Sequence, residues 1–590
     1  MSIVYNIITF KKEDRHIMNG KKSFSILFPN YEGVTYKQLS ETVCHDLGID
    51  LLCSELSDDK KEQNIIMNIV SNMTSDKRVA FYRQKVFADI LRLPELRSRL
   101  SELFERIEYI RKFTTVRMDT GEKLGFWLLM HKLDELSDYI KCVEEMRACL
   151  SEADISSEGL VGFRDYLDIL YDEARFKAMK KDISELKEKT SVIQSVTLGV
   201  NVNSRFEAVS LGLVSVNSKP FKKSNIVSNF ADAISEKDRI QESTDWDGDM
   251  HYHHVDKDHS KSFARFIENA GSMLAMTRTP FVDGRIRSTV VQSINNDETA
   301  GATFYLDRVM NKMLGSVIKK LRDVLSEYAD IAIVDISNVI PEFMYYIKFA
   351  EFVERFSGIG LKFCEAQLSQ SEDVSMNAKD FYNLKLAVKM DNVEELVYND
   401  LVFDREHTIY ILTGANRGGK TTVTQAIGIM FVLAQGGISV PGSAFEYKPV
   451  DCIYTHFPAD EEKTLDLGRL GEECVRFKSI YSECTGESLV LLNETFSTTS
   501  FEEGFYIAKD SVRALLKKGS ITIYNTHLHK LAAEMDDFNR ESGRFKVSSL
   551  IVKNDNGKRS FKVEVAMPEG MSYARDIAEK YGVTYEMLIE

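Results

Sequence analysis

Residues 409–427 read IYILTGANRGGKTTVTQAI, and this stretch decides the fold. It contains the complete pattern G-x-x-x-x-G-K-[ST] from Gly414 to Thr421, after an apolar run and before a helix-forming segment. Glycines allow backbone N–H groups to close around a phosphate, and the N-terminus of the following helix faces the same anion. The order strand, glycine loop, helix therefore predicts a nucleotide-binding P-loop in an α/β domain.

The loop residues have separate expected roles. Lys420 can neutralise the β- and γ-phosphate oxygens, and the Thr421 hydroxyl can ligate Mg²⁺, so the expected cofactors are ATP and Mg²⁺. Tyr398, which precedes the first strand of this domain, could stack on adenine, with a place in the core as the alternative. The predicted nucleotide-binding set is Gly414, Asn416, Gly418, Gly419, Lys420, Thr421, Thr422 and Tyr398.

A second apolar run, Ser488–Leu492, ends in the polar pair Asn493–Glu494. A short continuous apolar run is typical of a strand buried on both faces of a parallel sheet, and such strands deliver polar groups at their carboxyl ends. Glu494 is placed to act as the general base that orients the attacking water. The predicted metal site comprises Thr421, Asn493 and Glu494.

A third run, Ile521–Tyr524, leads into Asn525-Thr526-His527 after a helix expected from about 501 to 517. His527 can reach the γ-phosphate or its water, and a bond from the ring to a backbone carbonyl is the alternative. Lys420, Glu494 and His527 are thus the predicted catalytic residues.

These motifs resemble, in order and spacing, the ATPase domain of the MutS family: TGANRGGKTT (413–422), SLVLLNE (488–494), a loop ending in TTS (498–500), YNTH (524–527) and SYARDIAEKYG (572–582). The resemblance implies an α/β P-loop ATPase domain of the ABC class at the C-terminus. It also implies a mostly α-helical core and lever region before it, with a small β clamp insertion that grips DNA.

The sequence departs from the family pattern in three places. Asn493 replaces an aspartate, which removes a negative charge from the metal site and predicts slow turnover. The segment that reaches the partner's nucleotide is expected at Gly468–Glu473, where Gly468, Arg469 and Gly471 would open a helix and contact the γ-phosphate held by a second subunit. That arrangement implies a homodimer through the ATPase domains; a plain surface turn is the alternative. Because the chain stops at Glu590, the family's C-terminal dimerisation appendage is expected to be missing.

Composition narrows the class of protein. The 590 residues carry a formal net charge of −15, so DNA binding is expected only at local basic patches and should be sensitive to salt. The sequence has no apolar run of membrane-spanning length and no signal peptide, and its eight cysteines are scattered. We therefore expect reduced thiols, no membrane partner and a cytoplasmic location, associated with the nucleoid if the source is bacterial.

The pattern along the chain suggests five regions: a short head at 1–45, a helical core and ascending lever at 46–190, a clamp-like β insertion at 191–300, a returning lever with connector helices at 301–375, and the ATPase domain at 376–590. Period-two alternation predicts a hairpin within 191–217. Candidate phosphate contacts near it are Arg205, Lys219, Lys222 and Lys223, with solvated turn residues as the alternative. The His/Asp-rich segment 245–259 is expected to be a polar loop, with a metal site as the alternative.

The head is expected to form strands at 5–10 and 24–29 and is too short for the family's mismatch-reading domain. The Phe-x-Glu pattern of that domain is absent from the head. It matches at 349–351 and 363–365, in stretches expected to be helical, where we interpret it as accidental. We therefore expect the clamp to recognise branched DNA, recombination intermediates or plain duplex by shape rather than single mismatches. An RNA- or ribosome-binding module and a slow or inactive nucleotide-bound scaffold remain the alternatives.

Overall fold

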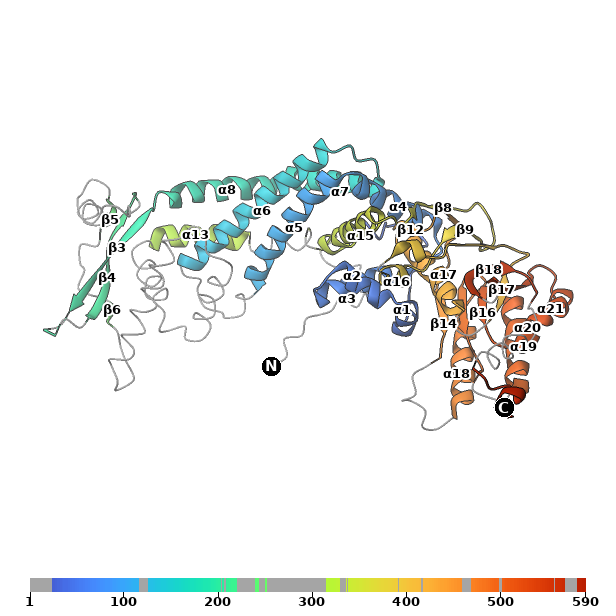
Figure 1. Ribbon diagram of the computed structural model, residues 1–590. Coiled ribbons are helices and arrows are strands. Elements are labelled where there is room, and N and C mark those ends of the chain that lie inside the picture. Colours follow the sequence, from blue (N-terminus) through green and yellow to red (C-terminus); the bar gives the residue numbers. More distant parts are fainter. Residues whose placement is uncertain are drawn as a thin grey trace. The chain divides into compact units, whose positions relative to one another are not determined.

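The computed structural model describes residues 24–115, 126–202, 204–205, 208–219, 239–242, 250–251, 315–328, 336, 338–390, 392–414, 418–458, 468–497, 501–555, 558–567 and 581–589. The chain forms two compact units (Figure 1). The first comprises 1–102, 148–166 and 335–590, and the second comprises 103–147 and 167–334.

A six-stranded sheet organises the C-terminal part of the first unit (Figure 1). Its order is β14 (Ile453–His456), β15 (Leu489–Asn493), β16 (Ile521–Asn525), β11 (Ile409–Thr413), β17 (Val547–Asp555) and β18 (Lys558–Val565). The first five strands run parallel and β18 is antiparallel to β17. Every residue of β11, β15 and β16 is buried, as their continuous apolar runs predict. Their carboxyl ends share one edge of the sheet.

Helices cover both faces of this sheet. One face packs on α18 (Gly468–Glu483), α19 (Phe501–Lys518), α20 (His529–Ala533) and α21 (Met535–Glu541) through a core that includes Val490 and Leu492. The intervening Leu491 points to the other face, where it lies against Gly428 of α17 (Lys420–Gln435). The alternation along β15 therefore places α17 on the second face, with its N-terminus at the carboxyl edge.

The first unit contains further helices and strands outside this sheet, and several of them pack on α17. The helices are α1 (Glu41–Leu47), α2 (Ile49–Leu56), α3 (Lys60–Val70), α4 (Lys77–Arg92), α15 (Ile340–Gly358), α16 (Leu384–Ala387) and, at the C-terminus, α23 (Tyr585–Ile589). A four-stranded sheet has the order β10 (Asn399–Phe403), β9 (Met376–Phe381), β13 (Ala444–Tyr447), β8 (Ala366–Leu368). Two short pairs are β1 (Lys37–Gln38) with β2 (Asn72–Met73) and β7 (Phe363–Cys364) with β12 (Val440–Pro441), and a 3₁₀ turn spans Val393–Glu395.

The C-terminal end of α17 is tied to α4 by Arg83, a residue that is only 1% exposed. Its guanidinium donates to the carbonyl of Gln435 at 3.0 Å and to that of Leu27 at 2.8 Å. Gly437 passes so close that a Cβ there would lie 2.6 Å from the Arg83 backbone. The φ of Gly437 is +84°, so glycine is required on both counts.

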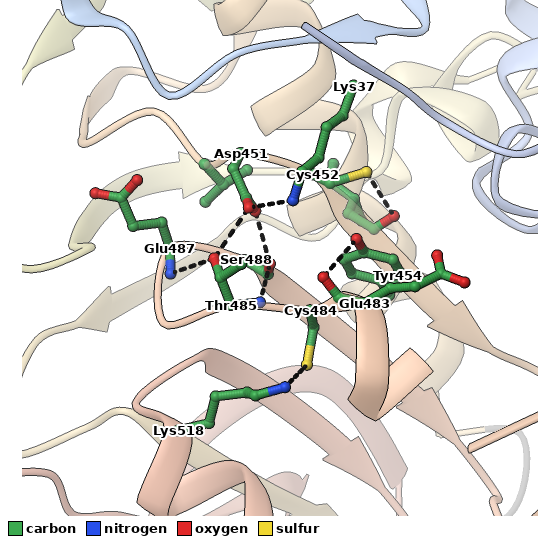
Figure 2. A network of polar contacts seen from close by, with 12 residues as sticks. Lys37, Asp451, Cys452, Tyr454, Glu483, Cys484, Thr485, Glu487, Ser488 and Lys518 are labelled. Carbon is green, nitrogen blue, oxygen red and sulfur yellow. Dashed lines mark hydrogen bonds and ion pairs between the residues drawn. The ribbon is translucent and has the colours of Figure 1, made fainter. Parts of the chain in front are cut away.

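The amino ends of β14 and β15 are joined by a polar network around Asp451 (Figure 2). The carboxylate accepts from Lys37 at 2.6 Å, from the Ser488 hydroxyl at 2.6 Å and from the Thr485 hydroxyl at 2.9 Å. These contacts fix the strand ends that are opposite the carboxyl edge, so they hold the register of β14 against β15 without taking part in the site.

The second unit contains the greater part of the long helices α5 (Pro94–Thr115) and α6 (Phe126–Glu152), the end of α7 (Glu158–Asp172), and α8 (Ala174–Ser191) and α13 (Gly315–Glu327). The expected hairpin is present, since β3 (Ser195–Val202) pairs antiparallel with β4 (Ala208–Asn217). Two short strands, β5 (Arg239–Glu242) and β6 (Met250–His251), also pair with β4. Tyr328 directly follows α13, and its hydroxyl donates a hydrogen bond to the Asp182 carboxylate on α8 at 2.6 Å.

Two secondary-structure predictions are wrong. Residues 24–29 form bends rather than a strand, because the N–H groups of Ile26 and Leu27 bind the Glu342 carboxylate at 2.8 and 3.1 Å. These donors are therefore not available to a ladder. Phe363–Cys364 form β7 rather than part of a helix, whereas 349–351 do lie within α15. The expected strand at 5–10 lies outside the described residues, as does the His/Asp-rich segment apart from β6.

The part of the chain that the structure describes contains no helix with the length and hydropathy needed to cross a membrane.

Candidate nucleotide-binding and hydrolysis site

The P-loop joins β11 to α17, and two of its glycines have backbone conformations that other residues rarely adopt. Gly414 has φ +143° and Gly419 has φ +90°. A Cβ at Gly414 would lie 3.2 Å from Val552, and one at Gly419 would lie 3.3 Å from the Phe561 ring. The loop therefore needs glycine at both positions. Gly418 is buried beside them, and Asn416 lies outside the described residues.

Lys420 is the first residue of α17 and is only 5% exposed. Its ammonium donates to the Gly414 carbonyl at 3.0 Å, which folds the side chain back over the loop. Burial lowers the pKa of Lys420, and the nearby Glu494 carboxylate acts in the opposite direction. A buried cation at a helix N-terminus is suited to receiving phosphate oxygens.

Thr421 and the Asn493 side chain meet across the site. The Thr421 hydroxyl donates to Asn493 Oδ1 at 3.1 Å, and Asn525 Nδ2 donates to the same oxygen. Among the described residues, Asn525 Oδ1 is a buried atom without a hydrogen-bond partner. Hydroxyl and amide oxygens can bind Mg²⁺ directly or accept hydrogen bonds from its water ligands. The buried Asn525 Oδ1 lies beside them and has the capacity to accept a further hydrogen bond. The donor set therefore fits a magnesium–triphosphate group, with Thr421 and Asn493 as the residues that would hold the metal or its waters.

Glu494 and His527 form a close pair. His527 Nε2 lies 2.7 Å from Glu494 Oε1, and both side chains are about one-third exposed. The hydrogen bond and charge of His527 lower the pKa of Glu494 and outweigh the effect of burial, and Lys420 adds to the lowering. The ring thus contacts a carboxylate instead of the backbone carbonyl that was the alternative.

The backbone at Glu494 is strained, with φ at +54°. The Glu494 N–H donates to the Asn525 carbonyl at 2.8 Å, which fixes the turn onto β16. Non-glycine residues held at positive φ cluster at functional sites because the surrounding structure must stabilise them. The turn therefore places the Glu494 carboxylate beside His527, which follows β16.

Sequence reasoning missed three nearby side chains. Asn525 is, in the sequence, only the residue after an apolar run, Asn383 donates to the Thr422 carbonyl at 2.7 Å, and Phe561 lies against Gly419. The φ of Phe561 is +56° and the residue is 43% exposed. A polar residue at the end of a buried strand was the signal for Asn525, whereas the other two come from distant segments.

The remaining candidates are spread over both units. Tyr398 packs edge-on against Tyr382, with the Lys362 ammonium 5.4 Å from its ring centroid. Gly468, Arg469 and Gly471 lie in the first turn of α18, so the expected helix start is present. Arg205 and Lys219 are exposed, whereas Lys222 and Lys223 lie outside the described residues.

A largely parallel sheet with the G-x-x-x-x-G-K-T motif and an acidic strand end on its carboxyl edge is typical of nucleotide-binding α/β domains. Residues 410–588 match the family model for MutS domain V, and residues 75–358 match the MutS2 N-terminal domain. The chain belongs to the MutS family, and its C-terminal part is an ABC-type ATPase domain with a largely helical region before it.

Curated relatives agree with this assignment. The chain is 23% identical to Endonuclease MutS2 of Caldicellulosiruptor bescii over 549 residues, which cover 88% of this chain and 62% of that protein. It is 31% identical over 199 residues to the DNA mismatch repair protein MutS of Prochlorococcus marinus strain MIT 9312, covering 33% of this chain and 21% of that protein. It is 26% identical over 234 residues to Endonuclease MutS2 of Thermus thermophilus, covering 39% of this chain and 30% of that protein. The chain thus spans less than two thirds of the length of these relatives.

Proposed function

We propose that this chain is a slow ATPase that couples ATP binding and hydrolysis to the opening and closing of a dimeric clamp on DNA. The observation that carries the proposal is the convergence of Lys420, the Thr421–Asn493 contact and the Glu494–His527 pair on one sheet edge. These groups come from the ends of two strands, β15 and β16, and from the start of α17, and each has a role in phosphoryl transfer to water.

The proposed roles follow from the chemistry of each side chain. Lys420 and the loop amides bind the triphosphate, and Thr421 with Asn493 holds Mg²⁺, which supplies charge neutralisation at the β- and γ-oxygens when bound. Glu494, kept ionised by His527 and Lys420, accepts hydrogen bonds from the attacking water and orients it. Slow turnover follows from Asn493, because an amide gives the metal site one negative charge fewer than a carboxylate.

The clamp requires a second copy of the chain. The first turn of α18, with Gly468, Arg469 and Gly471, is proposed to close the nucleotide site of the partner subunit through backbone N–H groups and a guanidinium. The hairpin β3–β4 is proposed to contact the DNA backbone. The candidate contacts are Arg205 and Lys219, which the structure describes, and Lys222 and Lys223, which lie outside the described residues. Since the net charge is −15, binding through a few basic residues should weaken steeply with salt.

Equilibrium binding tests this proposal. Fluorescently labelled four-way junction, mismatched duplex, homoduplex and structured RNA are titrated at two salt concentrations, with ATP, with ADP and without nucleotide. The expected result is preferential binding to the junction that depends on nucleotide and weakens with salt. Preferential binding to structured RNA, with no response of DNA binding to nucleotide, would contradict the DNA clamp and favour an RNA- or ribosome-binding module.

A further inference from the structure

His456 is the last residue of β14 and is 2% exposed. Its two ring nitrogens contact two different elements. Nε2 lies 3.2 Å from the backbone carbonyl of Glu473 in α18, and Nδ1 lies 3.2 Å from the hydroxyl of Thr495. Thr495 follows Glu494 directly, so one imidazole ring bridges α18 and the turn that carries the proposed general base.

The chemistry of the partners assigns the direction of both bonds. A carbonyl oxygen only accepts, so His456 Nε2 carries the hydrogen and donates to Glu473. Burial and the Arg476 guanidinium lower the pKa of His456 to about 4, so the ring is neutral near pH 7. Nδ1 is then a lone-pair acceptor. The Thr495 hydroxyl lies 3.2 Å from Nδ1 and 3.4 Å from the His456 carbonyl, and the shorter contact assigns its hydrogen to Nδ1. The ring is therefore held at both ends in one tautomer.

The turn that His456 reaches is short and constrained. Residues Glu494 and Phe496 have φ of +54° and +63°, and the Thr495 carbonyl between them accepts from the Tyr524 hydroxyl at 3.0 Å. The centroid of the Phe496 ring lies 5.6 Å from the centroid of the Phe477 ring on α18. Because the turn is held at several points, a displacement at Thr495 is transmitted to Glu494 instead of being absorbed by a flexible loop.

Arg476 ties α18 to the end of β14 a second time. Its guanidinium donates to the carbonyl of Phe457 at 2.8 Å, one residue beyond His456. This contact fixes the spacing of helix and strand end, so movement of the first turn of α18 acts on the imidazole through the Glu473 carbonyl. The bridge is buried and lies outside the contacts of Lys420 and Thr421.

We propose that His456 is a positioning residue that couples α18 to Glu494, so that engagement of α18 with the partner's nucleotide sets the orientation of the catalytic carboxylate. This inference rests on the proposed function, in which α18 closes the second subunit's site. It predicts that breaking either bond of the bridge lowers the hydrolysis rate and leaves ATP binding intact.

Conservative variants separate the two bonds. In His456→Gln the amide nitrogen replaces Nε2 and keeps the donation to Glu473, whereas in His456→Asn the amide group replaces Nδ1 and keeps the Thr495 contact. Thr495→Val removes the hydroxyl at almost constant volume, and Thr495→Ser restores it. His45→Gln is the matched control, because the His45 side chain is 78% exposed and pairs only with Asp50 among its described ion pairs.

Steady-state ATPase assays and binding of a fluorescent ATP analogue are measured for each variant. Losing one neutral hydrogen bond predicts a fall in kcat of about threefold to tenfold for H456Q, H456N and T495V, with KM and analogue affinity within about twofold. T495S and H45Q should match the wild type. The double variant H456Q/T495V should lose no more than either single variant, because both break the same bridge.

The outcomes are distinguishable. If the wild type hydrolyses ATP and T495V has the same kcat, the coupling role is overturned. It is also overturned if the variants lose ATP affinity by the same factor as kcat. Additive losses in the double variant also overturn it. A wild-type chain that binds no ATP overturns the proposed function and this inference together. If the His456 variants do not fold, the T495V and T495S pair decides the question alone.

Discussion

Replacing Glu494 by glutamine separates catalysis from structure at the centre of the site. The amide keeps the size of the side chain and an oxygen that can accept from His527 Nε2, which lies 2.7 Å away in the wild type. The backbone contacts of the turn, such as the Glu494 N–H to the Asn525 carbonyl, do not involve the side chain. The substitution should therefore leave the φ of +54° and the aim of the side chain unchanged.

The magnitudes of the two effects differ widely. Exchanging a charge-assisted hydrogen bond for a neutral one costs roughly 1 kcal/mol, and less here because both side chains are about one-third exposed. Removing a general base lowers kcat by about 10²- to 10⁴-fold. The expected phenotype is a protein that folds, binds ATP within a few-fold of the wild type and hardly hydrolyses it.

The three quantities are measured on one preparation: kcat by steady-state phosphate release, ATP affinity by binding of an ATP analogue, and stability by thermal melting. Glu494→Asp is a useful companion, because it keeps the charge and withdraws the carboxylate from His527. A fall in kcat of less than tenfold in Glu494→Gln would refute the assignment of Glu494 as the base. A loss of ATP affinity as large as the loss of kcat would show that the residue binds nucleotide instead.

Three further predictions test other parts of the account. Asn493→Asp should raise Mg²⁺-dependent kcat, because the carboxylate restores a negative charge to the metal site, and a lower kcat in phosphate-release assays would refute this. Burial raises the pKa of Glu342 from its ordinary 4.5 to about 7, so the stability contributed by the protonated carboxyl is lost as pH rises from 4.5 to 7. At 1.36 kcal/mol for each pH unit, the difference of 2.5 lowers the free energy of unfolding by up to ~3 kcal/mol, which thermal melting at several pH values measures. Glu342→Gln should remove most of this pH dependence. Gly437→Ala should destabilise the fold by about 2 kcal/mol or more, since φ is +84° and the new Cβ meets the Arg83 backbone, whereas Gly358→Ala, with no atom within 4 Å, should melt like the wild type.

Several features of the site could be predicted because local sequence determines them. The runs 409–412, 489–492 and 521–524 are apolar almost throughout, so strands buried on both faces accommodate them best. Each ends on polar residues, and parallel strands bring those ends to one edge. That logic placed Lys420 and Glu494 on the same edge without any knowledge of strand order.

The missing features depend on contacts between distant parts of the chain. Asn525 contributes to the site because β16 lies between β11 and β15, an order that hydropathy does not encode. Residues 24–29 resemble a strand, but their N–H groups bind Glu342, which is more than 300 residues away. His456 looks like a single histidine in the sequence, and its role emerges only when Thr495 and α18 are packed against it.

Stimulation of ATP turnover by nucleic acid is the most direct test of the central claim. Steady-state ATPase activity is measured alone and with homoduplex, mismatched duplex, four-way junction and structured RNA, at two salt concentrations, with Lys420→Ala as the control for contaminating activity. The account predicts slow basal turnover that a junction stimulates more than a homoduplex, with less stimulation at high salt. Turnover that no DNA alters at either salt concentration would contradict an ATP-driven DNA clamp.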